Sequence, residues 1–586
     1  MGSRGAAVRS RLVRLLPPPL LLFALAVVLR ILPNVMNAAW GNDFGIYLGL
    51  TERILETGDI FPAYDGWGTS YQYFPALYLA AAAVHLVTGA SPVIALGLVA
   101  GFAGGLTVHF AYRLGLELFA SRRLALLGAL LLAVEPVHVY ETSHPAPLAL
   151  GHLSLVLTLW LFLRWRRGGS WWPLIPAVGL LLTSHHLSTY VLLLDVAGIA
   201  FAYRLLNRSD DGTFRRDLRF LGFVTTAAFA YWGVVATPVL SHVQWVTGLP
   251  AGVVLPLGLA AILLAGRFVP KIAARASPVL TRLLGELNPR RAFLVILSFG
   301  VGFLVLNIVA PPWGPVFGLR PEALFILLPV LLLLALAGAG FALAVPRIRW
   351  TPLVGILLAT LGSLAFGMVT QSTVILPLRH LEYLSLPVCF FAAKALRAAA
   401  QRWSLRAPGL LRARWAGRLP GVMGIAATVL LLSNAWSGYA VTVGALGIDG
   451  RIPDASLGLV DWMASHLETN GSVAADHRMS QILWARGFNA TNDDAVLVFT
   501  EAEWDRIEGE LRTFDPRVDY VLVDHVMVES GVQSGVVADP PRMTEASYAK
   551  FSLAPFQLVH REESADGTRW AELYRIDWEW ADRHTK

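Results

Sequence analysis

The sequence predicts an α-helical polytopic membrane protein with a small exterior α/β domain at its C-terminus. Of its 586 residues, 55% are hydrophobic and only 15% are charged, whereas soluble domains carry about 25% charged residues. Apolar runs of membrane-spanning length recur up to residue 448, and the composition of a soluble domain follows. We therefore expect a transmembrane domain over residues 1–448, with an outer loop at 34–90, and a soluble exterior domain over 449–586.

Charge and cysteine content limit the possible partners and the covalent structure. The net charge is +7, but the arginines stand in short clusters between apolar runs, which is typical of cytoplasmic loops of membrane proteins. The excess of basic residues therefore indicates which loops are cytoplasmic, and it predicts no nucleic-acid partner. Cys389 is the single cysteine of the chain, so the exterior domain is expected to fold without an intramolecular disulfide.

The N-terminal segment predicts the orientation of the first span. Arginines punctuate residues 1–16, and an apolar run over 17–32 follows that is too long for a cleaved signal peptide. We expect a first span with its N-terminus in the cytoplasm and, after an odd number of crossings, a C-terminal domain outside. The high content of Ala, Arg and Gly favours a prokaryotic source, hence the plasma membrane.

About thirteen crossings are expected from the pattern of apolar runs. The remaining twelve spans are predicted near 92–112, 124–136, 148–163, 171–184, 187–203, 220–238, 250–266, 292–310, 322–345, 351–369, 381–396 and 421–441. The arginine clusters between them lie inside only if the apolar stretch 72–89 does not cross. That stretch is marginally long for a span, which needs about 20 residues, so we expect a helix at the outer interface.

The exterior domain is predicted from shorter patterns. The alternating run 518–524 predicts a strand that ends in a polar turn. Amphipathic patterns over 455–468 and 500–513 predict helices. Together these elements indicate a small α/β domain of ordinary size.

The first candidate functional residue is Asp43, which lies about ten residues beyond the first apolar run. It stands between Trp40 and Tyr47, in a loop that continues through Tyr73. Aromatic side chains stack on sugar rings, and a carboxylate can accept a hydroxyl proton or hold a divalent cation. The alternative is an interfacial Asp that caps a short helix beside an aromatic belt.

A second polar segment, residues 135–144, follows the third predicted span. It concentrates two carboxylates and two imidazoles where ionisable groups are costly and usually functional. With Asp43 it is a candidate cation site, for Mg²⁺ or Mn²⁺, or an acid/base pair; a solvated turn is the alternative. Glu141 is the better ligand because Glu135 can cap a span beside Pro136, and His144 is a candidate substrate contact.

Two further outer-face groups are candidate substrate contacts. Adjacent histidines point about 100° apart on a helix, so His185 and its neighbour predict no paired zinc site, but His185 can line a substrate cavity or make an interfacial hydrogen bond. Arg379 is out of place at the outer face, and its planar fork suits phosphate oxygens; a helix pair with Glu382 is the alternative. His380 adjoins it, and Arg320 is a weaker second candidate.

This arrangement resembles the GT-C superfamily of membrane glycosyltransferases, and most of all the catalytic subunit of oligosaccharyltransferase. The resemblance implies transfer of a sugar from a polyprenyl-phosphate donor to a glycan, lipid or protein acceptor at the outer face of a lipid membrane. It also implies that Asp43 acts as general base or cation ligand and that Arg379 stabilises the departing phosphate.

One segment departs from that resemblance. Where the oligosaccharyltransferase subunit carries Trp-Trp-Asp-Tyr-Gly, this chain has Val-Ala-Ala-Asp-His-Arg-Met-Ser at 473–480. A pocket that reads a protein acceptor sequence is therefore not expected. A lipid-linked sugar flippase or a secondary transporter is the competing class, although its internal repeats and mid-span ionisable groups are not evident in the sequence.

Overall fold

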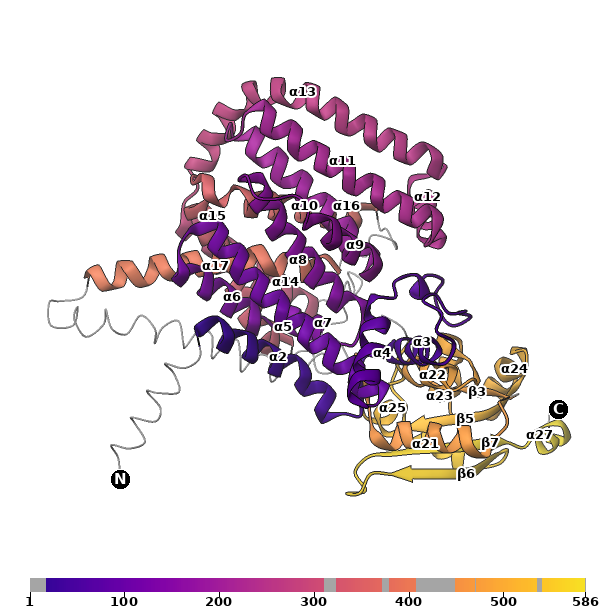
Figure 1. Cartoon of the computed structure of the whole chain (residues 1–586). Helices are drawn as coiled ribbons and strands as arrows, with labels where there is room; N and C mark the ends of the chain where they lie inside the picture. The colour runs from indigo at the N-terminus through magenta and orange to yellow at the C-terminus, as the bar shows by residue number, and fades with distance from the viewer. Residues whose placement is uncertain are drawn as a thin grey trace.

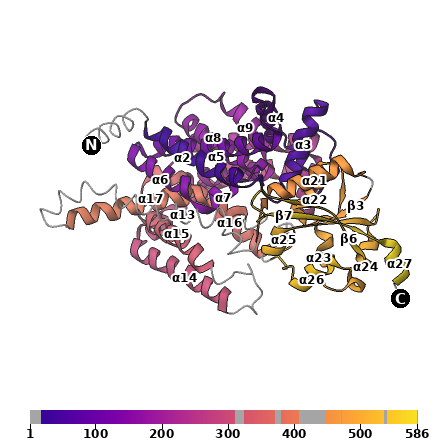
Figure 2. The same cartoon turned by 90° about the horizontal axis from the view of Figure 1, so that it is seen from below.

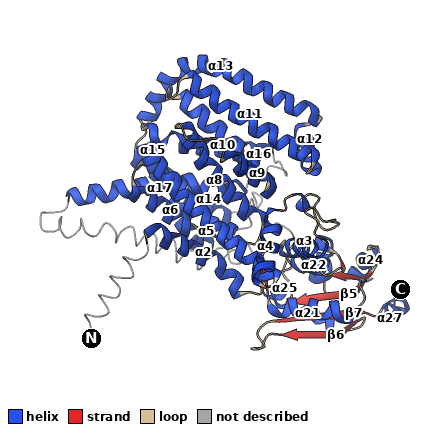
Figure 3. Cartoon of the chain, in the orientation of Figure 1, coloured by secondary structure: helices blue, strands red, loops and turns tan. Residues whose placement is uncertain are grey.

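The computed structural model describes residues 17–309, 323–370, 379–406, 448–469, 471–534 and 540–584. A helical bundle makes up most of the molecule, and a smaller domain formed by the C-terminal part of the chain packs against one end of it (Figure 1). The five-stranded sheet belongs to this C-terminal domain, whereas the bundle is built of helices (Figure 3).

Within the described residues, eight helices are long and apolar enough to cross a membrane, or nine if a pair bent by 61° forms one span. The chain is thus a helical integral membrane protein, as predicted. The predicted span at 421–441 lies outside the described residues, so the count of about thirteen stays a prediction. The bundle helices are α2 (Pro18–Met36), α5 (Pro92–Phe119), α6 (Arg122–Val134), α7 (Pro136–Ser143), α8 (Pro147–Arg166), α9 (Leu174–Ser184), α10 (His186–Leu205), α11 (Asp211–Val234), α12 (Thr237–Thr247), α13 (Ala251–Gly285), α14 (Pro289–Val309), α15 (Ala323–Ala344), α16 (Thr351–Thr370) and α17 (His380–Arg406).

Two predicted boundaries are wrong, and one predicted span is shorter than a crossing requires. The segment 135–144 is the helix α7 and not a loop, because Glu135 caps its first backbone N–H groups. Helix α13 continues to Gly285, through the loop that was expected after residue 266, since a helix satisfies every backbone group internally in an apolar environment. Helix α9 has 11 residues, about 17 Å of length, which is too short to cross alone.

The apolar stretch at 72–89 forms a short helix, as its marginal length suggested. Helix α4 (Ala76–Thr88) has 13 residues and ends at Gly89 in the left-handed conformation. At about 1.5 Å per residue it is about 20 Å long, well short of a span. The loop before it contains the 3₁₀ turn η1 (Tyr71–Tyr73).

The C-terminal domain is an α/β sandwich of a mixed sheet and short helices. Its strand order is β4-β3-β5-β7-β6, with β3 parallel to β4 and β5 and the other pairs antiparallel. The predicted strand at 518–524 and the predicted helices are confirmed within a few residues, as β5, α21 and α24. The elements are β2 (Arg451–Ile452), α21 (Asp454–His466), β3 (Ser472–Ala474), α22 (His477–Ala485), β4 (Asn489–Ala490), α23 (Val496–Thr500), α24 (Trp504–Thr513), β5 (Val518–Asp524), α25 (His525–Glu529), α26 (Glu545–Ala549), β6 (Phe556–Glu563), β7 (Trp570–Ile576) and α27 (Trp578–His584).

Helix α3 (Phe44–Thr57) joins the two parts of the molecule, because it packs against α22 of the C-terminal domain (Figure 2). The contact is close: a Cβ atom on Gly45 would lie 2.1 Å from the backbone of Gln481, and one on Gly49 would lie 2.6 Å from the ring of Trp484. Only glycine at these two positions lets the helices approach so closely.

The chain just before α3 is tied to the same domain. Strand β1 (Ala39–Trp40) pairs antiparallel with β2, and the N–H of Gly41 donates to the carbonyl of Gly450 at 2.8 Å. At the other end of α3, the Arg486 guanidinium lies 2.6 Å from the carboxylate of Glu52. The segment around Asp43 is therefore held on both sides by the C-terminal domain.

We predict that Gly45→Ala loosens this contact. The added methyl group must displace the backbone of α22, and overpacking of this kind costs about 1–3 kcal/mol. The expected result is a lower midpoint of heat unfolding and faster protease cleavage of the C-terminal domain in detergent solution.

Gly509→Ala is the matched control, because Gly509 lies in α24 with open space around it. Alanine favours an exposed helix by about 1 kcal/mol relative to glycine, so this variant should be at least as resistant as the wild type. Equal protease resistance of Gly45→Ala and wild type would contradict the close packing.

Candidate active site

Asp43 occupies the N-cap position of α3, but its side chain makes no capping hydrogen bond. Its carboxylate instead receives three side-chain contacts: His477 Nε2 lies 3.0 Å from Oδ1, and the hydroxyls of Tyr47 and Tyr71 each donate to Oδ2 at 3.3 Å. The side chain remains 24% exposed. The simple capping alternative is not what the structure shows; the carboxylate faces a polar, accessible site.

His477, the first residue of α22, is the partner that the sequence analysis did not identify. Its fully buried ring lies between two carboxylates, with Nε2 on Asp43 and Nδ1 2.8 Å from Oδ1 of Asp493. The ring of Trp67 stands edge-on at 4.9 Å. Burial by itself would lower the pKa of His477, but hydrogen bonds and charge from the two carboxylates raise it to about 9. At neutral pH the ring is therefore an imidazolium that donates from both nitrogens.

The same contact keeps Asp43 ionised. Burial alone would raise its pKa, but the hydrogen bond and the charge of His477, with further contributions from Arg379 and Tyr71, hold the pKa of Asp43 below its usual value. Such a carboxylate is a strong hydrogen-bond acceptor at neutral pH, and a weak proton acceptor.

Aromatic side chains surround this carboxylate. The ring of Tyr71 lies 5.9 Å from Tyr47, 6.1 Å from Tyr64 and 6.3 Å from Trp67. Burial raises the pKa of Tyr71 well above its usual value, so its hydroxyl stays a donor. The backbone of Tyr73 contacts the bundle, because its carbonyl accepts from Tyr231 of α11 at 2.7 Å; its side chain as a substrate contact stays a prediction.

Helix α7 and the start of α17 bring further predicted residues to Asp43. Arg379 Nη1 lies 4.0 Å from Oε2 of Glu141, and Arg379 is also within electrostatic range of Asp43 and Glu382. The ring of His144 stacks on Trp40 at 5.4 Å, with 17° between the planes. Three segments that are distant in the sequence thus meet at one site.

His144 also explains the backbone at Gly41. This residue has a φ of +117°, and an added Cβ would lie 3.1 Å from the His144 ring. A glycine there lets the chain turn sharply over the imidazole before it reaches Asp43.

Two predicted substrate contacts are occupied by contacts within the bundle. His380 is fully buried, and its Nε2 lies 2.8 Å from the hydroxyl of Ser363. His185 caps α10 through its Nδ1, which accepts from the N–H of Ser188 at 3.3 Å. The roles of both residues as substrate contacts stay predictions. Arg320 lies outside the described residues.

A cation site at Asp43 and Glu141 stays a prediction. Among the residues that the structure describes, no group of three or more His, Cys, Asp or Glu side chains is arranged to hold a metal ion. Arg379 is the cationic neighbour that both carboxylates share. A divalent cation such as Mg²⁺ often takes one or two carboxylates and completes its oxygen ligands with waters or phosphate.

A second residue absent from the sequence predictions is Arg30, which is fully buried in α2. Its guanidinium donates to Thr142 Oγ1 at 2.7 Å and to the carbonyl of Ala133 at 3.2 Å, and it lies 2.6 Å from His138 Nδ1. These bonds fix α7, and with it Glu141, against the first span. The sequence signal was available, because an arginine within an apolar run is costly unless it has partners.

Comparison with known proteins identifies the fold. No protein-family model and no curated protein matches the chain. Among solved structures, an archaeal oligosaccharyltransferase, AglB from Archaeoglobus fulgidus in complex with an inhibitory peptide and a dolichol-phosphate, matches with a TM-score of 0.58 and 14% identity over 97% of this chain and 80% of that chain.

A second structure gives the same result. The Archaeoglobus fulgidus oligosaccharyltransferase in complex with Zn and sulfate matches with a TM-score of 0.53 and 15% identity, over 96% of this chain and 73% of that chain. A weaker likeness, with a TM-score of 0.35 and 13% identity over 94% of this chain and 97% of that chain, is to ArnT from Cupriavidus metallidurans bound to undecaprenyl phosphate.

The chain therefore shares the fold of the two oligosaccharyltransferase structures. The predicted resemblance to the oligosaccharyltransferase catalytic subunit is thus confirmed at the level of fold.

We predict that the attachment of the C-terminal domain weakens at alkaline pH. His477 has a folded pKa of about 9, above its unfolded value of about 6.5. Its stabilising contribution is therefore complete below about pH 6.5 and is lost as the pH rises through about 9. Protease susceptibility of the domain, measured from pH 6 to pH 10, should rise in this window.

The variant His477→Gln should remove this alkaline transition, since the titrating group is gone. His466→Gln, which changes an exposed histidine of α21, should keep it. An unchanged alkaline transition in His477→Gln would show that another group controls the attachment.

Proposed function

We propose that this protein transfers a sugar from a polyprenyl-phosphate-linked donor to a hydroxyl acceptor at the exterior membrane face. One observation carries the proposal: an ionised, partly exposed carboxylate, Asp43, stands within electrostatic range of the guanidinium of Arg379, beside a cluster of tyrosines. The fold adds support, because one structure that shares it was solved with dolichol-phosphate bound.

The reaction breaks the bond between the anomeric carbon and the phosphate oxygen of the carrier, and forms a bond from that carbon to the acceptor oxygen. Negative charge develops on the departing phosphate. Arg379 is the residue that we assign to this charge, since its guanidinium can donate two parallel hydrogen bonds to phosphate oxygens. Glu141, 4.0 Å away, orients the guanidinium.

We assign Asp43 to binding the acceptor hydroxyl. The hydroxyl donates a hydrogen bond to a free lone pair of the Asp43 carboxylate. Its pKa is held below the usual value, so it accepts the proton fully only late in the reaction, as the acceptor oxygen becomes positively charged. The carboxylate also favours the positive charge that develops at the anomeric carbon.

His477 is a positioning residue in this proposal. His477 contacts Oδ1 of Asp43, and the hydroxyls of Tyr47 and Tyr71 donate to Oδ2. Together these contacts fix the orientation of the Asp43 carboxylate. The C-terminal domain therefore contributes to the site in the membrane domain, and a point variant of His477 tests that contribution more cleanly than deletion of the domain.

The acceptor is proposed to be a glycan or lipid hydroxyl and not a peptide. The segment at 473–480 has no free polar group for a peptide. The guanidinium of Arg478 lies 2.8 Å from the carboxylate of Asp476 and 3.0 Å from that of Asp524, and all three side chains are fully or almost fully buried. These ion pairs lie within the domain, so the segment holds the fold of α22 in place.

We predict that Asp43→Asn lowers sugar transfer by roughly 10² to 10⁴-fold. The asparagine keeps the shape but loses the charge that receives the proton. Transfer is measured in proteoliposomes with a panel of radiolabelled polyprenyl-phosphate sugars, at equal expression, and donor binding is measured in parallel.

Asp59→Asn, an exposed residue at the end of α3, is the control and should transfer like the wild type. Unchanged transfer by Asp43→Asn would remove this carboxylate from the chemistry. Scrambling of labelled lipid across the bilayer, without transfer from any donor, would favour a flippase.

A second prediction concerns Arg379. Arg379→Gln should lower transfer by roughly 10² to 10³-fold, as loss of a charge-stabilising donor does, and Arg379→Lys should recover part of it because charge returns without the planar fork. Arg542→Gln, exposed on the C-terminal domain, serves as the control. Equal activity of the Gln and Lys variants would argue against a role for the positive charge.

A further inference from the structure

A groove of about 890 Å³ runs between α11 and α13, away from the candidate active site. Both helices lie on the side of the bundle that faces away from the C-terminal domain (Figure 1). Helix α10 begins next to the Asp43 loop, where His186 contacts Phe74 at 5.3 Å, and it runs for 20 residues before α11 starts. That is a distance of about 30 Å.

Four cationic side chains line one end of this groove. Arg215 and Arg219 are four residues apart on α11, and Arg267 and Lys271 are four residues apart on α13. In the described parts of the chain, none of the four forms an ion pair with a carboxylate; the one acidic lining residue, Asp211, is paired with Arg204 at 2.5 Å. Like charges at this spacing repel one another, so an anion between the helices would be stabilised.

The rest of the groove is apolar. Leu218, Leu259, Ile262 and Leu263 line it, and Gly222 adds an open position with no atom near its Cβ direction. On α13 the apolar part runs from residue 259 to residue 266, about 10 Å, so it can hold part of a lipid acyl chain. Helix α13 has no buried residue in its apolar window, so the groove opens sideways to the bilayer.

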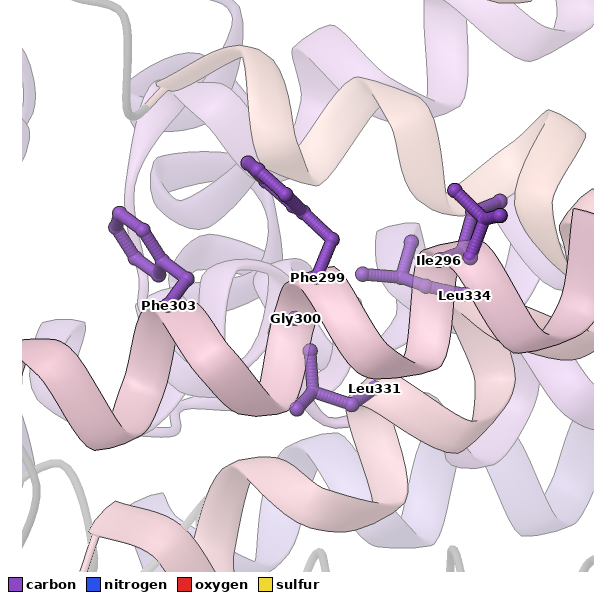
Figure 4. A pocket seen from close by; sticks show the side chains of 7 residues that line it. Ile296, Phe299, Gly300, Phe303, Leu331 and Leu334 are labelled. Atoms are coloured by element: carbon purple, nitrogen blue, oxygen red, sulfur yellow. The ribbon is translucent and has the colours of Figure 1, made fainter.

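A second groove shows what the cations add. The groove between α14 and α15 is smaller, about 350 Å³, and its lining is apolar throughout (Figure 4). Phe299, Phe303 and Leu331 lie there, with no charged side chain among the lining residues. Such a surface accepts any acyl chain, whereas the groove between α11 and α13 can select the charge of a headgroup.

We propose that the groove between α11 and α13 binds an anionic phospholipid of the surrounding membrane. Its phosphate lies between the two cation pairs, and one acyl chain lies along the apolar part. By the positive-inside rule the arginine-rich ends of these helices face the cytoplasm, where basic pockets between spans bind anionic headgroups. The donor lipid is not the occupant, because its phosphate would lie about 30 Å from Asp43.

The test uses the full-length protein in detergent, with bound lipid measured by native mass spectrometry. Phosphatidylglycerol is compared with phosphatidylcholine for the wild type and for the double variant Arg267→Gln/Lys271→Gln. We expect the wild type to prefer phosphatidylglycerol and the double variant to bind it about 10- to 30-fold more weakly. The measurement is of binding alone, so it does not depend on the proposed transfer reaction.

The double variant Arg275→Gln/Arg290→Gln is the matched control. It removes the same charge at exposed positions that do not line the groove, and it should bind phosphatidylglycerol like the wild type. An equal loss in both double variants would show a general surface-charge effect and overturn the proposal, as would no loss in either.

Two competitors distinguish the source of the phosphate. Inorganic phosphate in excess should not displace phosphatidylglycerol, because it lacks the acyl chain that fills the apolar part. Undecaprenyl phosphate should compete no better than phosphatidylglycerol. Displacement by inorganic phosphate would reduce the groove to an anion site, and clear preference for undecaprenyl phosphate would make it a carrier-lipid site; either result overturns the assignment to a membrane phospholipid.

Discussion

The contact between Asp43 and His477 is the interaction on which the arrangement of the candidate site depends. The two residues are 434 positions apart in the chain, yet Oδ1 and Nε2 lie 3.0 Å apart. A buried imidazolium between Asp43 and Asp493 is stable only while the C-terminal domain stays on α3, and the close approach of α22 at Gly45 provides that contact. The domain is thus part of the site and not an appended module.

The buried arginine of the first span supports the site from the membrane side. Arg30 offers its hydrogen bonds to the backbone and side chains around α7, and Glu135 takes the N–H groups at the start of the same helix and the hydroxyl of Ser385. In an apolar environment these bonds have no competing water, so they fix α7 firmly. The positions of Glu141 and His144 follow from that helix.

Charge is distributed unevenly between the two ends of the bundle. At the end that carries Asp43, His477 lies against Asp43 and Arg379 lies near Glu141, so opposite charges stand together, which suits a site that must hold and release a charged ligand. At the groove between α11 and α13, four cations stand together without a carboxylate partner among the described residues. The first arrangement fits chemistry on a substrate, and the second fits steady occupation by an anionic lipid.

The sequence alone determined that this is a polytopic membrane protein with a soluble domain, because hydropathy indicates whether each segment lies in lipid or in water. The first span, the strand 518–524, the non-crossing stretch 72–89 and the candidate carboxylate Asp43 could all be predicted from local pattern. The exact ends of α7 and α13 could not, since capping by Glu135 and continued hydrogen bonding past residue 266 depend on neighbouring elements and on the apolar surroundings.

Only the tertiary structure decided which residues share the site. His380 follows Arg379 directly in the sequence, but the ring of His380 contacts Ser363 in the bundle whereas Arg379 lies near Glu141. His477 carried no signal beyond its place in a divergent segment, because a pairing over 434 positions is set by how α22 packs on α3. Sequence patterns indicate whether one segment is a helix or a strand and whether it lies in lipid or water. Which distant segments meet is determined by packing. Here α3 and α22 can meet because Gly45 and Gly49 carry no side chains.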